Sequence, residues 1–171
     1  MSKILIAYYS RKGQNYVNGN IKNLDKGNTE IVAEFIQKTV GGDLFEIDTV
    51  KKYAEDYTAC TIEAKEELKA KARPELKKFL PNIDEYDAIF IGYPCWWGTM
   101  PMACFTFLER YDTTNKKIIP FCTHEGSGLA ASEKDIKKTC PKASVVSGLA
   151  IRGANAAKSE KEVAAWAKKS L

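Results

Sequence analysis

Four short runs of apolar, mostly β-branched residues are the feature that most narrows the fold of this chain. Each run ends at turn residues, which is the pattern of a parallel strand buried on both faces. The runs are KILIAYY (3–9), DAIFIGY (87–93), KIIPFCT (117–123) and ASVVSGLAI (143–151). A fifth run, DLFEIDT (43–49), alternates apolar and acidic residues and is typical of an edge strand.

Helical patterns stand between these runs, so strand and helix alternate along the chain. Helices are expected at 29–40, 58–72, 101–111 and 129–139 and, from the capping box Ser159-x-x-Glu162, after residue 159. The alternation predicts one doubly wound α/β domain over residues 1–171. Its strands are parallel, its crossovers are right-handed, and its helices lie on both faces of the sheet.

Charge and composition indicate which binding partners and which cellular compartment to expect. The net charge of +4 is spread evenly, without a dense basic block, so nucleic acid is not an expected partner. Five cysteines without a C-x-x-C pair indicate free thiols rather than a disulfide framework or a zinc site. The chain enters a strand at once, and no apolar run approaches the roughly 20 residues that span a bilayer. We therefore expect a cytoplasmic protein with no membrane partner.

The first candidate binding loop follows the run 3–9, because ligands of doubly wound folds bind beyond the carboxyl ends of the strands. This loop ends in Gly27-Asn28-Thr29, directly at a helix start, where unpaired N–H groups favour an anion. The hydroxyls of Ser10 and Thr29 can add donors. The alternative is ordinary helix capping by Asn28 or Thr29.

The second candidate loop follows the run 87–93 and carries two adjacent tryptophans. Its residues include Pro94, Cys95, Trp96, Trp97 and Gly98. A loop has no layer that could hide both indoles, so at least one is expected to stack on a flat ligand. The alternative is that one tryptophan covers the end of the sheet.

The third candidate loop is small, polar and rich in backbone N–H donors. It comprises Thr123, His124, Glu125, Gly126, Ser127 and Gly128. Residues 126–131 match the dinucleotide motif G-x-G-x-x-A, but they follow the fourth strand and no acid ends the next one, so we discount the match. His124, the single histidine, is more typical of a hydrogen-bonding residue than of a catalyst.

Together the three loops offer an anion site, an aromatic wall and a ring of backbone donors. A ligand with a phosphate, a chain and a flat ring fits them, and flavin mononucleotide (FMN) is the leading candidate. A phosphoacceptor receiver would need acids where Tyr9-Ser10 and Tyr93-Pro94 stand, and a low-molecular-weight phosphatase would need a cysteine after the first strand. No nucleophile–base arrangement is evident, so we assign no catalytic residue.

Nearly the whole chain resembles the flavodoxins, and in particular a short flavodoxin-like family with the motif Tyr-Pro-x-Trp-Trp-Gly-x-x-Pro. The resemblance rests on Tyr9-Ser10-Arg11, Gly27-Asn28-Thr29, Arg73-Pro74-Glu75-Leu76, the segment 92–101 and the segment 123–128. It implies a five-stranded parallel sheet in the order 2-1-3-4-5 that binds FMN noncovalently.

The resemblance also implies roles for individual residues. The phosphate loop would comprise Ser10, Asn28 and Thr29, and Arg11 and Lys12 beside it are also expected to bind the cofactor. The pair Trp97-Gly98 would flank the ring, with the peptide at Gly98 turning over on reduction. Residues 123–128 would contact the pyrimidine edge.

Two features depart from the family pattern. Flavodoxins that carry electrons are usually acidic, whereas this chain has a net charge of +4. Fifteen residues, 12–26, also stand in the phosphate loop where one is expected. We expect this insertion to fold over the phosphate end of the site, with Lys12 or Lys26 reaching the phosphate. The alternative is a surface excursion without a role in binding.

Two functions remain open at this point. The first is an electron carrier that serves a redox partner protein. The second is an FMN-dependent reductase that takes hydride from NAD(P)H and passes electrons to a quinone or a similar small acceptor.

Overall fold

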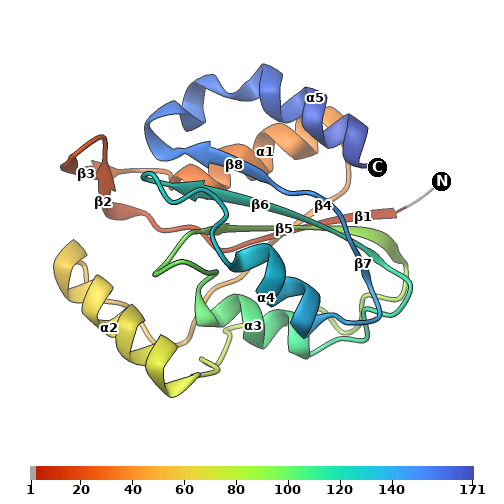
Figure 1. The fold of residues 1–171 in the computed structure, drawn as a ribbon, viewed down its shortest axis with the longest axis horizontal. Coiled ribbons are helices and arrows are strands. Elements are labelled where there is room, and N and C mark those ends of the chain that lie inside the picture. The colour runs from red at the N-terminus through yellow and green to blue at the C-terminus, as the bar shows by residue number, and fades with distance from the viewer. Residues whose placement is uncertain (1–2) are drawn as a thin grey trace.

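The computed structural model describes residues 3–171, which form an α/β fold around a parallel sheet (Figure 1). The strands lie in the order β4-β1-β5-β6, and β7 and β8 both pair with the outer side of β6. Their bounds are β1 Lys3–Tyr8, β4 Asp43–Glu46, β5 Tyr86–Pro94, β6 Lys117–His124, β7 Ser144–Val145 and β8 Leu149–Arg152. With β7 and β8 taken as one interrupted strand, this order is 2-1-3-4-5, and the predicted fold class is confirmed.

The fifth position of the sheet is broken, whereas the run 143–151 predicted one continuous strand. The carbonyl of Ile118 in β6 accepts from Val146 N–H, so the backbone groups of residue 120 face the same neighbouring strand. Residue 120 is a proline, which has no N–H to donate. Gly148 N–H instead donates to the Glu133 carboxylate over 2.9 Å. Pro120 thus removes one ladder hydrogen bond at the break, and the bond from Gly148 to Glu133 removes the other.

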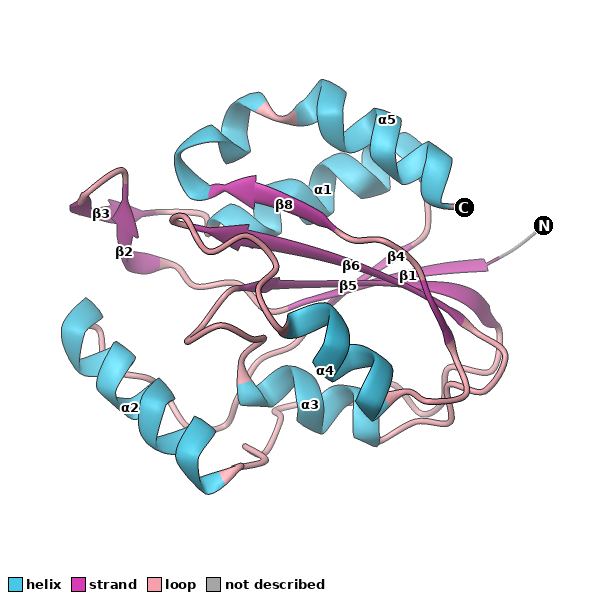
Figure 2. Cartoon of the chain, viewed as in Figure 1, coloured by secondary structure: helices cyan, strands magenta, loops and turns pink. Residues whose placement is uncertain are grey.

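Helices cover both faces of the sheet (Figure 2). Helices α1 (Asn28–Val40) and α5 (Glu160–Ser170) lie on one face, and α3 (Met102–Glu109) and α4 (Ser132–Thr139) lie on the other. Helix α2 (Tyr57–Ala70) lies beside α3, toward the end of the sheet where the strands finish. A 3-10 helix, η1 (Gly153–Lys158), leads into α5.

The core consists of two buried clusters, one on each face. In β5, Ile89 packs in the cluster that contains Phe107 of α3, and the next residue, Phe90, packs in the cluster that contains Val32 of α1. Successive side chains of a strand point to opposite faces. Burial on both faces explains why the strand runs are apolar without alternation.

The helix after residue 159 forms, but the predicted capping box is wrong. The Ser159 hydroxyl donates to the carbonyl of Ala156 over 2.7 Å, and the helix has no side-chain cap hydrogen bond from Ser159. Because η1 ends at this point, one of its last carbonyls takes up the Ser159 hydroxyl, which then does not cap α5. The helix expected at 129–139 also begins later, at Ser132, since Ala130 adopts a positive φ of 46°.

The insertion 12–26 folds into a β-hairpin that the sequence analysis did not predict. Strand β2 (Gly13–Val17) pairs antiparallel with β3 (Asn20–Leu24). The turn residues Asn18 and Gly19 have φ values of 52° and 84°. Two positive φ values are the signature of a two-residue hairpin turn, for which Asn-Gly is the preferred sequence.

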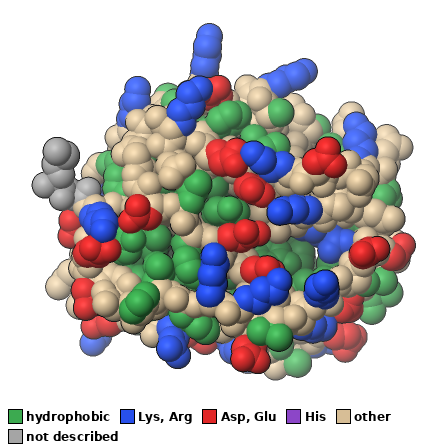
Figure 3. Space-filling view, turned by 180° about the vertical axis from the view of Figure 1, so that it is seen from behind, with side chains coloured by type: hydrophobic (Ala, Val, Ile, Leu, Met, Phe, Trp, Pro, Cys, Tyr) green, Lys and Arg blue, Asp and Glu red, His purple; other side chains and the backbone are tan. Residues whose placement is uncertain are grey.

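Acidic and basic side chains are interspersed over the molecular face that Figure 3 shows. Several of them form exposed ion pairs, such as Lys38 with Glu160 and Arg73 with Glu109. Within residues 3–171, no helix combines the length and apolar character needed to cross a membrane.

Candidate functional site

The three candidate loops converge where β1, β5 and β6 end, next to the hairpin and α2 (Figure 1). Between them lies a cavity of about 100 Å³, here called the three-loop hollow. Its lining residues are Arg11, Asn15, Tyr16, Asn28, Tyr57, Pro94, Cys95, Trp96, Thr123, His124, Glu125 and Gly153. Eight of these twelve residues were predicted to bind the cofactor, and they are drawn from all three loops.

The start of α1 is held in place by the two hydroxyl residues that were expected to bind an anion. The Ser10 hydroxyl accepts from Glu30 N–H over 3.1 Å. Thr29 is 1% exposed, and its hydroxyl lies 2.9 Å from that of Thr123. Ser10 and Thr29 therefore fix the first turn of the helix, while Asn28 lines the hollow.

Gly27 allows the end of β1 and the start of α1 to approach closely. A Cβ atom at Gly27 would lie 2.1 Å from Ser10 Oγ and 2.6 Å from the Arg11 carbonyl oxygen. Its φ of −66° is open to any residue, so space alone requires glycine here. The helix N-terminus is thereby brought against the loop that leaves β1, which is the arrangement of an anion site.

Arg11 ties the base of the hairpin to the segment before α2. Its Nε donates to the carbonyl of Gln14, and its Nη2 donates to the carbonyls of Ala54 and Glu55, each over 2.9 Å. Much of its donor capacity is thus used by backbone oxygens, although the residue lines the hollow.

The hairpin borders the hollow and contacts both of its walls. The side-chain oxygen Oε1 of Gln14 accepts from Tyr57 N–H over 2.8 Å. The rings of Tyr16 and Tyr57 stack with centroids 6.0 Å apart. At the tip, Asn18 N–H donates to Glu125 Oε2 over 2.9 Å. The hairpin is therefore part of the site's wall rather than a detached excursion.

The expectation that Lys26 reaches a phosphate stays a prediction. In this structure its ammonium group forms an exposed ion pair with Glu34 of α1 at 2.8 Å. Lys12 is exposed and is not among the residues that line the hollow, so its proposed contact stays a prediction.

The two tryptophans have different environments. Trp96 is partly buried and meets Tyr9 and Tyr53 edge-on, with ring centroids 5.2 and 5.3 Å apart. Trp97 is 51% exposed, and its indole N–H donates to the carbonyl of Thr61 over 2.9 Å. Trp96 therefore closes the end of the sheet, as one of the two sequence interpretations had it, and Trp97 stands at the rim; stacking of either indole on a ligand stays a prediction.

The tryptophan loop is anchored to the start of α4. Tyr93 Oη donates to Ser132 Oγ over 2.7 Å, and Thr99 Oγ1 donates to Asp135 Oδ2. The Gly98 carbonyl accepts from Ala131 N–H over 2.9 Å. Any reorientation of the peptide at Gly98 must break this last bond.

In the third loop, His124 acts as a hydrogen-bond acceptor. Its Nδ1 accepts from Gly126 N–H over 2.9 Å. Burial, with a smaller contribution from the Arg152 charge, lowers the pKa of His124 below its ordinary value, so the ring is neutral near pH 7. Gly126, Ser127 and Gly128 do not line the hollow.

Glu125 contributes the negative charge in the three-loop hollow. One oxygen, Oε2, accepts from the hairpin tip, while Oε1 is buried and has no hydrogen-bond partner among the described residues. A Cβ atom at Gly153 would lie 2.7 Å from Glu125 Oε1 and 2.8 Å from the side-chain nitrogen of Asn28. Gly153 therefore lets the backbone of η1 approach both side chains. A buried acceptor without a partner is rare in folded proteins, which makes Glu125 Oε1 a candidate contact for a ligand donor.

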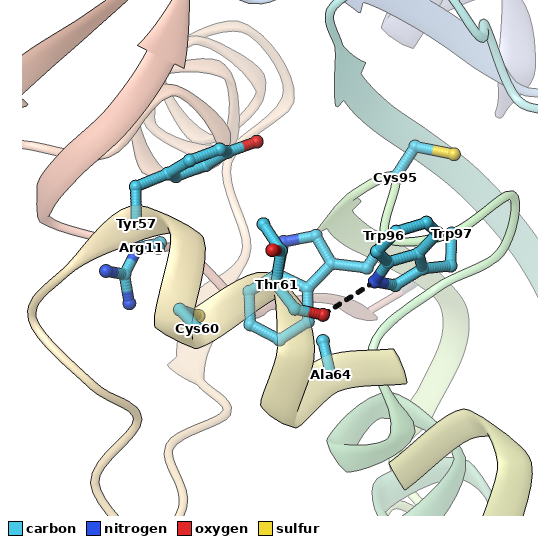
Figure 4. Close-up of a pocket in the computed structure, with 8 residues that line it drawn as sticks. All are labelled: Arg11, Tyr57, Cys60, Thr61, Ala64, Cys95, Trp96 and Trp97. Atoms are coloured by element: carbon cyan, nitrogen blue, oxygen red, sulfur yellow. Dashed lines mark hydrogen bonds between the residues drawn. The ribbon is translucent and has the colours of Figure 1, made fainter. Parts of the chain in front are cut away.

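A second cavity of about 280 Å³, here called the α2 hollow, adjoins the first (Figure 4). It is lined by Arg11, Tyr57, Cys60, Thr61, Ala64, Cys95, Trp96 and Trp97. The sequence analysis missed the contribution of α2 to both cavities. The residues 57, 60, 61 and 64 do have the spacing of one helix face, but the sequence does not indicate what that face packs against.

Comparison with known proteins agrees with this architecture. A family model described as flavodoxin matches residues 3–170. A protein from Bacteroides uniformis described as a candidate flavoprotein is 30% identical, with a TM-score of 0.77 and coverage of 98% of both chains. A similarly described protein from Bacteroides eggerthii is 31% identical, with a TM-score of 0.77 and coverage of 99% of this chain and 98% of that one.

A more distant solved structure is that of a flavoprotein in complex with FMN from Lactobacillus acidophilus. It is 21% identical and has a TM-score of 0.64, with coverage of 94% of this chain and 99% of that one, and it shows a shared fold. No curated protein matches the chain significantly.

Substitution of Gly98 and of Gly27 by alanine is expected to lower the unfolding free energy by different amounts. Gly98 has a φ of 83° but open space around its Cβ position, so Gly98→Ala should cost only backbone strain, about 1 kcal/mol of unfolding free energy. Gly27→Ala introduces a clash with the Arg11 carbonyl and should cost about 2 kcal/mol or more. Urea unfolding measures both values, and a Gly27→Ala variant as stable as Gly98→Ala would contradict the close approach.

Proposed function

This chain belongs to the flavodoxin family, and we propose that it transfers electrons through noncovalently bound FMN. The observation that carries the proposal is the three-loop hollow. It brings a helix N-terminus, an indole and a buried unpartnered carboxylate oxygen together at the carboxyl end of the sheet. These are the kinds of group that a phosphate, a flat ring and a hydrogen-bond donor require.

The residues of the hollow fit FMN in chemical type. The first turn of α1, with Gly27 as its N-cap and Asn28 beside it, would hold the phosphate. Trp96 would contact the ring, and Trp97 would shield its edge. Glu125 Oε1 would accept from a ring N–H or a hydroxyl of the ribityl chain, both of which FMN supplies.

FMN supplies the redox chemistry, because its ring can gain and release one or two electrons. The protein's residues then decide how favourable that gain is. The carboxylate of Glu125 disfavours added negative charge nearby, and the neutral His124 does not offset it. The loop that carries Trp97 is held by its bonds to α2 and α4, which limits rearrangement during transfer.

The electrons pass to a redox partner protein or to a small molecule. The combined hollows are at the low end of the volumes that hold small-molecule ligands, roughly 300–1,000 Å³, which favours a carrier that binds a single cofactor. Five free cysteines, four of them buried, suit a reducing compartment such as the cytoplasm.

An FMN-dependent reductase that takes hydride from NAD(P)H is the second candidate. It requires that bound FMN leave part of the α2 hollow open to a small acceptor.

Purification and mixing experiments test both levels of the proposal. The purified protein should be yellow, and acid should release FMN; a colourless protein that fails to bind added FMN contradicts FMN binding. On stopped-flow mixing with NADPH, a carrier should keep its flavin absorbance. Rapid bleaching at substoichiometric protein would instead favour the reductase.

Glu125→Gln should raise the midpoint potential of bound FMN. The amide keeps an oxygen for Asn18 N–H but removes a charge worth about 1–3 kcal/mol at a partly buried site, or roughly 20–60 mV for two electrons. Glu34→Gln, which removes an exposed acid that lines neither hollow, is the matched control and should leave the potential unchanged. An unchanged or more negative potential in Glu125→Gln would place the carboxylate away from the ring.

Shortening the hairpin should weaken FMN binding. Replacing residues 12–26 by a single residue removes Asn15 and Tyr16 from the lining of the hollow and removes the contact with Glu125. Quenching of FMN fluorescence should then give a dissociation constant at least about tenfold higher. Lys26→Ala alone, which loses the exposed pair with Glu34, shows how much of the change belongs to Lys26 rather than to the hairpin, and equal affinity in the shortened protein would contradict a binding role for the hairpin.

A further inference from the structure

The three-loop hollow and the α2 hollow share part of their lining and together form one site. The shared residues are Arg11, Tyr57, Cys95 and Trp96. Because the Trp96 indole lines both hollows, its direction decides the shape of the space that a flat ring can enter (Figure 4). The contacts that hold this indole are therefore part of how the site works.

The backbone of Trp96 is fixed by a tight turn, but its ring is positioned by two neighbouring rings. Trp96 N–H donates to the Thr99 carbonyl over 2.8 Å, and Thr99 N–H donates back over 3.3 Å. The indole meets Tyr9 and Tyr53 edge-on, at interplanar angles of 77° and 88°. Tyr9 and Tyr53 also meet edge-on, with centroids 6.4 Å apart, so the three rings form a closed cluster. Such contacts define the plane of the indole for as long as both neighbours stay in place.

Of the two neighbours, Tyr9 is held by the sheet, whereas Tyr53 is held by a side chain of α2. Tyr9 is 6% exposed, and its N–H donates to the Gly92 carbonyl over 2.9 Å. Tyr53 is only partly buried and lies in the segment before α2. Its Oη donates to Glu67 Oε2 over 3.0 Å. Burial, together with this bond, raises the pKa of Tyr53 far above its ordinary value, so the hydroxyl remains a donor.

Glu67 is an energetically costly residue at its position in α2. It is 8% exposed, and the other buried residues of this helix are Cys60 and Ala64. Its Oε1 is also buried and has no hydrogen-bond partner among the described residues, and the exposed Lys51 ammonium lies 4.0 Å away. An apolar side chain of similar size would avoid the cost of burying a carboxylate. Packing alone therefore does not explain an acid here, whereas its bond to Tyr53 does.

Glu67, Tyr53 and Trp96 also line one narrow crevice beside the hollows. Its volume is about 10 Å³. That is about the smallest space that holds one water molecule. The indole therefore has little room to turn while Tyr53 stays bonded to Glu67.

From these contacts we propose that Glu67 is a positioning residue of the cofactor site, which fixes the Trp96 indole by holding Tyr53 in place. Glu67 lines neither hollow, so it acts only through the ring of Tyr53. An indole that is already fixed contacts a flat ring without being ordered on binding, and this favours binding. The inference rests on the proposed function, because the ring that Trp96 would contact is that of FMN.

Two substitutions remove the bond from opposite sides. Tyr53→Phe keeps the ring but removes the donor, and Glu67→Leu removes the acceptor. Each should raise the dissociation constant of FMN about fivefold or more, measured by quenching of FMN fluorescence. The double variant should bind FMN no more weakly than the weaker of the two single variants, because both substitutions remove the same bond.

Conservative rescue and a matched control accompany these variants. Glu67→Gln keeps an oxygen for Tyr53 Oη and should bind FMN within about twofold of the wild-type protein. Tyr86→Phe is the control, because Tyr86 Oη donates to the Asp43 carboxylate over 2.7 Å in a bond of the same kind. Tyr86 and Asp43 begin β5 and β4, at the opposite end of the sheet from the site, so FMN affinity should not change.

Visible circular dichroism at saturating FMN separates positioning from a purely structural role. The signal of bound FMN depends on the groups placed around its ring. It should change in Tyr53→Phe and Glu67→Leu and be preserved in Glu67→Gln and Tyr86→Phe. Wild-type affinity and an unchanged signal in Tyr53→Phe and Glu67→Leu overturn the inference, even if urea unfolds these variants more easily. Binding by Glu67→Gln that is as weak as that of Glu67→Leu also overturns it.

Failure of the proposed function gives a different result. If the wild-type protein does not bind FMN, the proposed function is wrong, and near-ultraviolet circular dichroism of the tryptophans then tests the position of Trp96. Tyr53→Phe should alter that signal, and Glu67→Gln should preserve it. An unchanged signal in Tyr53→Phe overturns the inference independently of FMN.

Discussion

The buried hydrogen bond between the hydroxyls of Thr29 and Thr123 is the contact on which the rest of the site depends. It joins the first turn of α1 to the end of β6, which are 94 residues apart in the sequence. Both residues are at most 5% exposed, so separating them would leave two polar groups without water or a partner. Because Asn28 and His124 adjoin these threonines, the bond sets how far apart two walls of the three-loop hollow stand.

The strands, the sheet order and most helix positions could be predicted because they follow from local periodicity and from the two-sided burial of a parallel sheet. The misses have non-local causes. The break between β7 and β8 arises from Pro120 in the neighbouring strand and from the bond of Gly148 to Glu133 of α4. The lost cap at Ser159 arises from a carbonyl of the preceding turn. The hairpin is different, since Asn18-Gly19 was a readable turn signal in the sequence.

The site was predictable as a set of loops but less so as a set of side chains. Asn28 lines the three-loop hollow while its neighbour Thr29 is buried behind it, and the sequence carries no signal for that difference. The direction of a side chain within a tight turn depends on one or two dihedral angles, which tertiary packing decides. The same holds for Trp97, whose positive φ turns it away from Trp96, and for α2, whose role depends on how it docks.

The hairpin enters the chain at a point where the two ends of the insertion already lie side by side. Gly27 and Ser10 approach so closely that no side chain fits between them, with or without the residues that intervene. A segment whose ends meet in this way adds little closure entropy as it lengthens. Its own strand pairs are local in sequence, so it leaves the long-range contacts of the sheet unchanged. The hairpin can therefore be gained, lost or exchanged as a unit. The wall that it adds to the three-loop hollow can then change while the α/β scaffold stays constant.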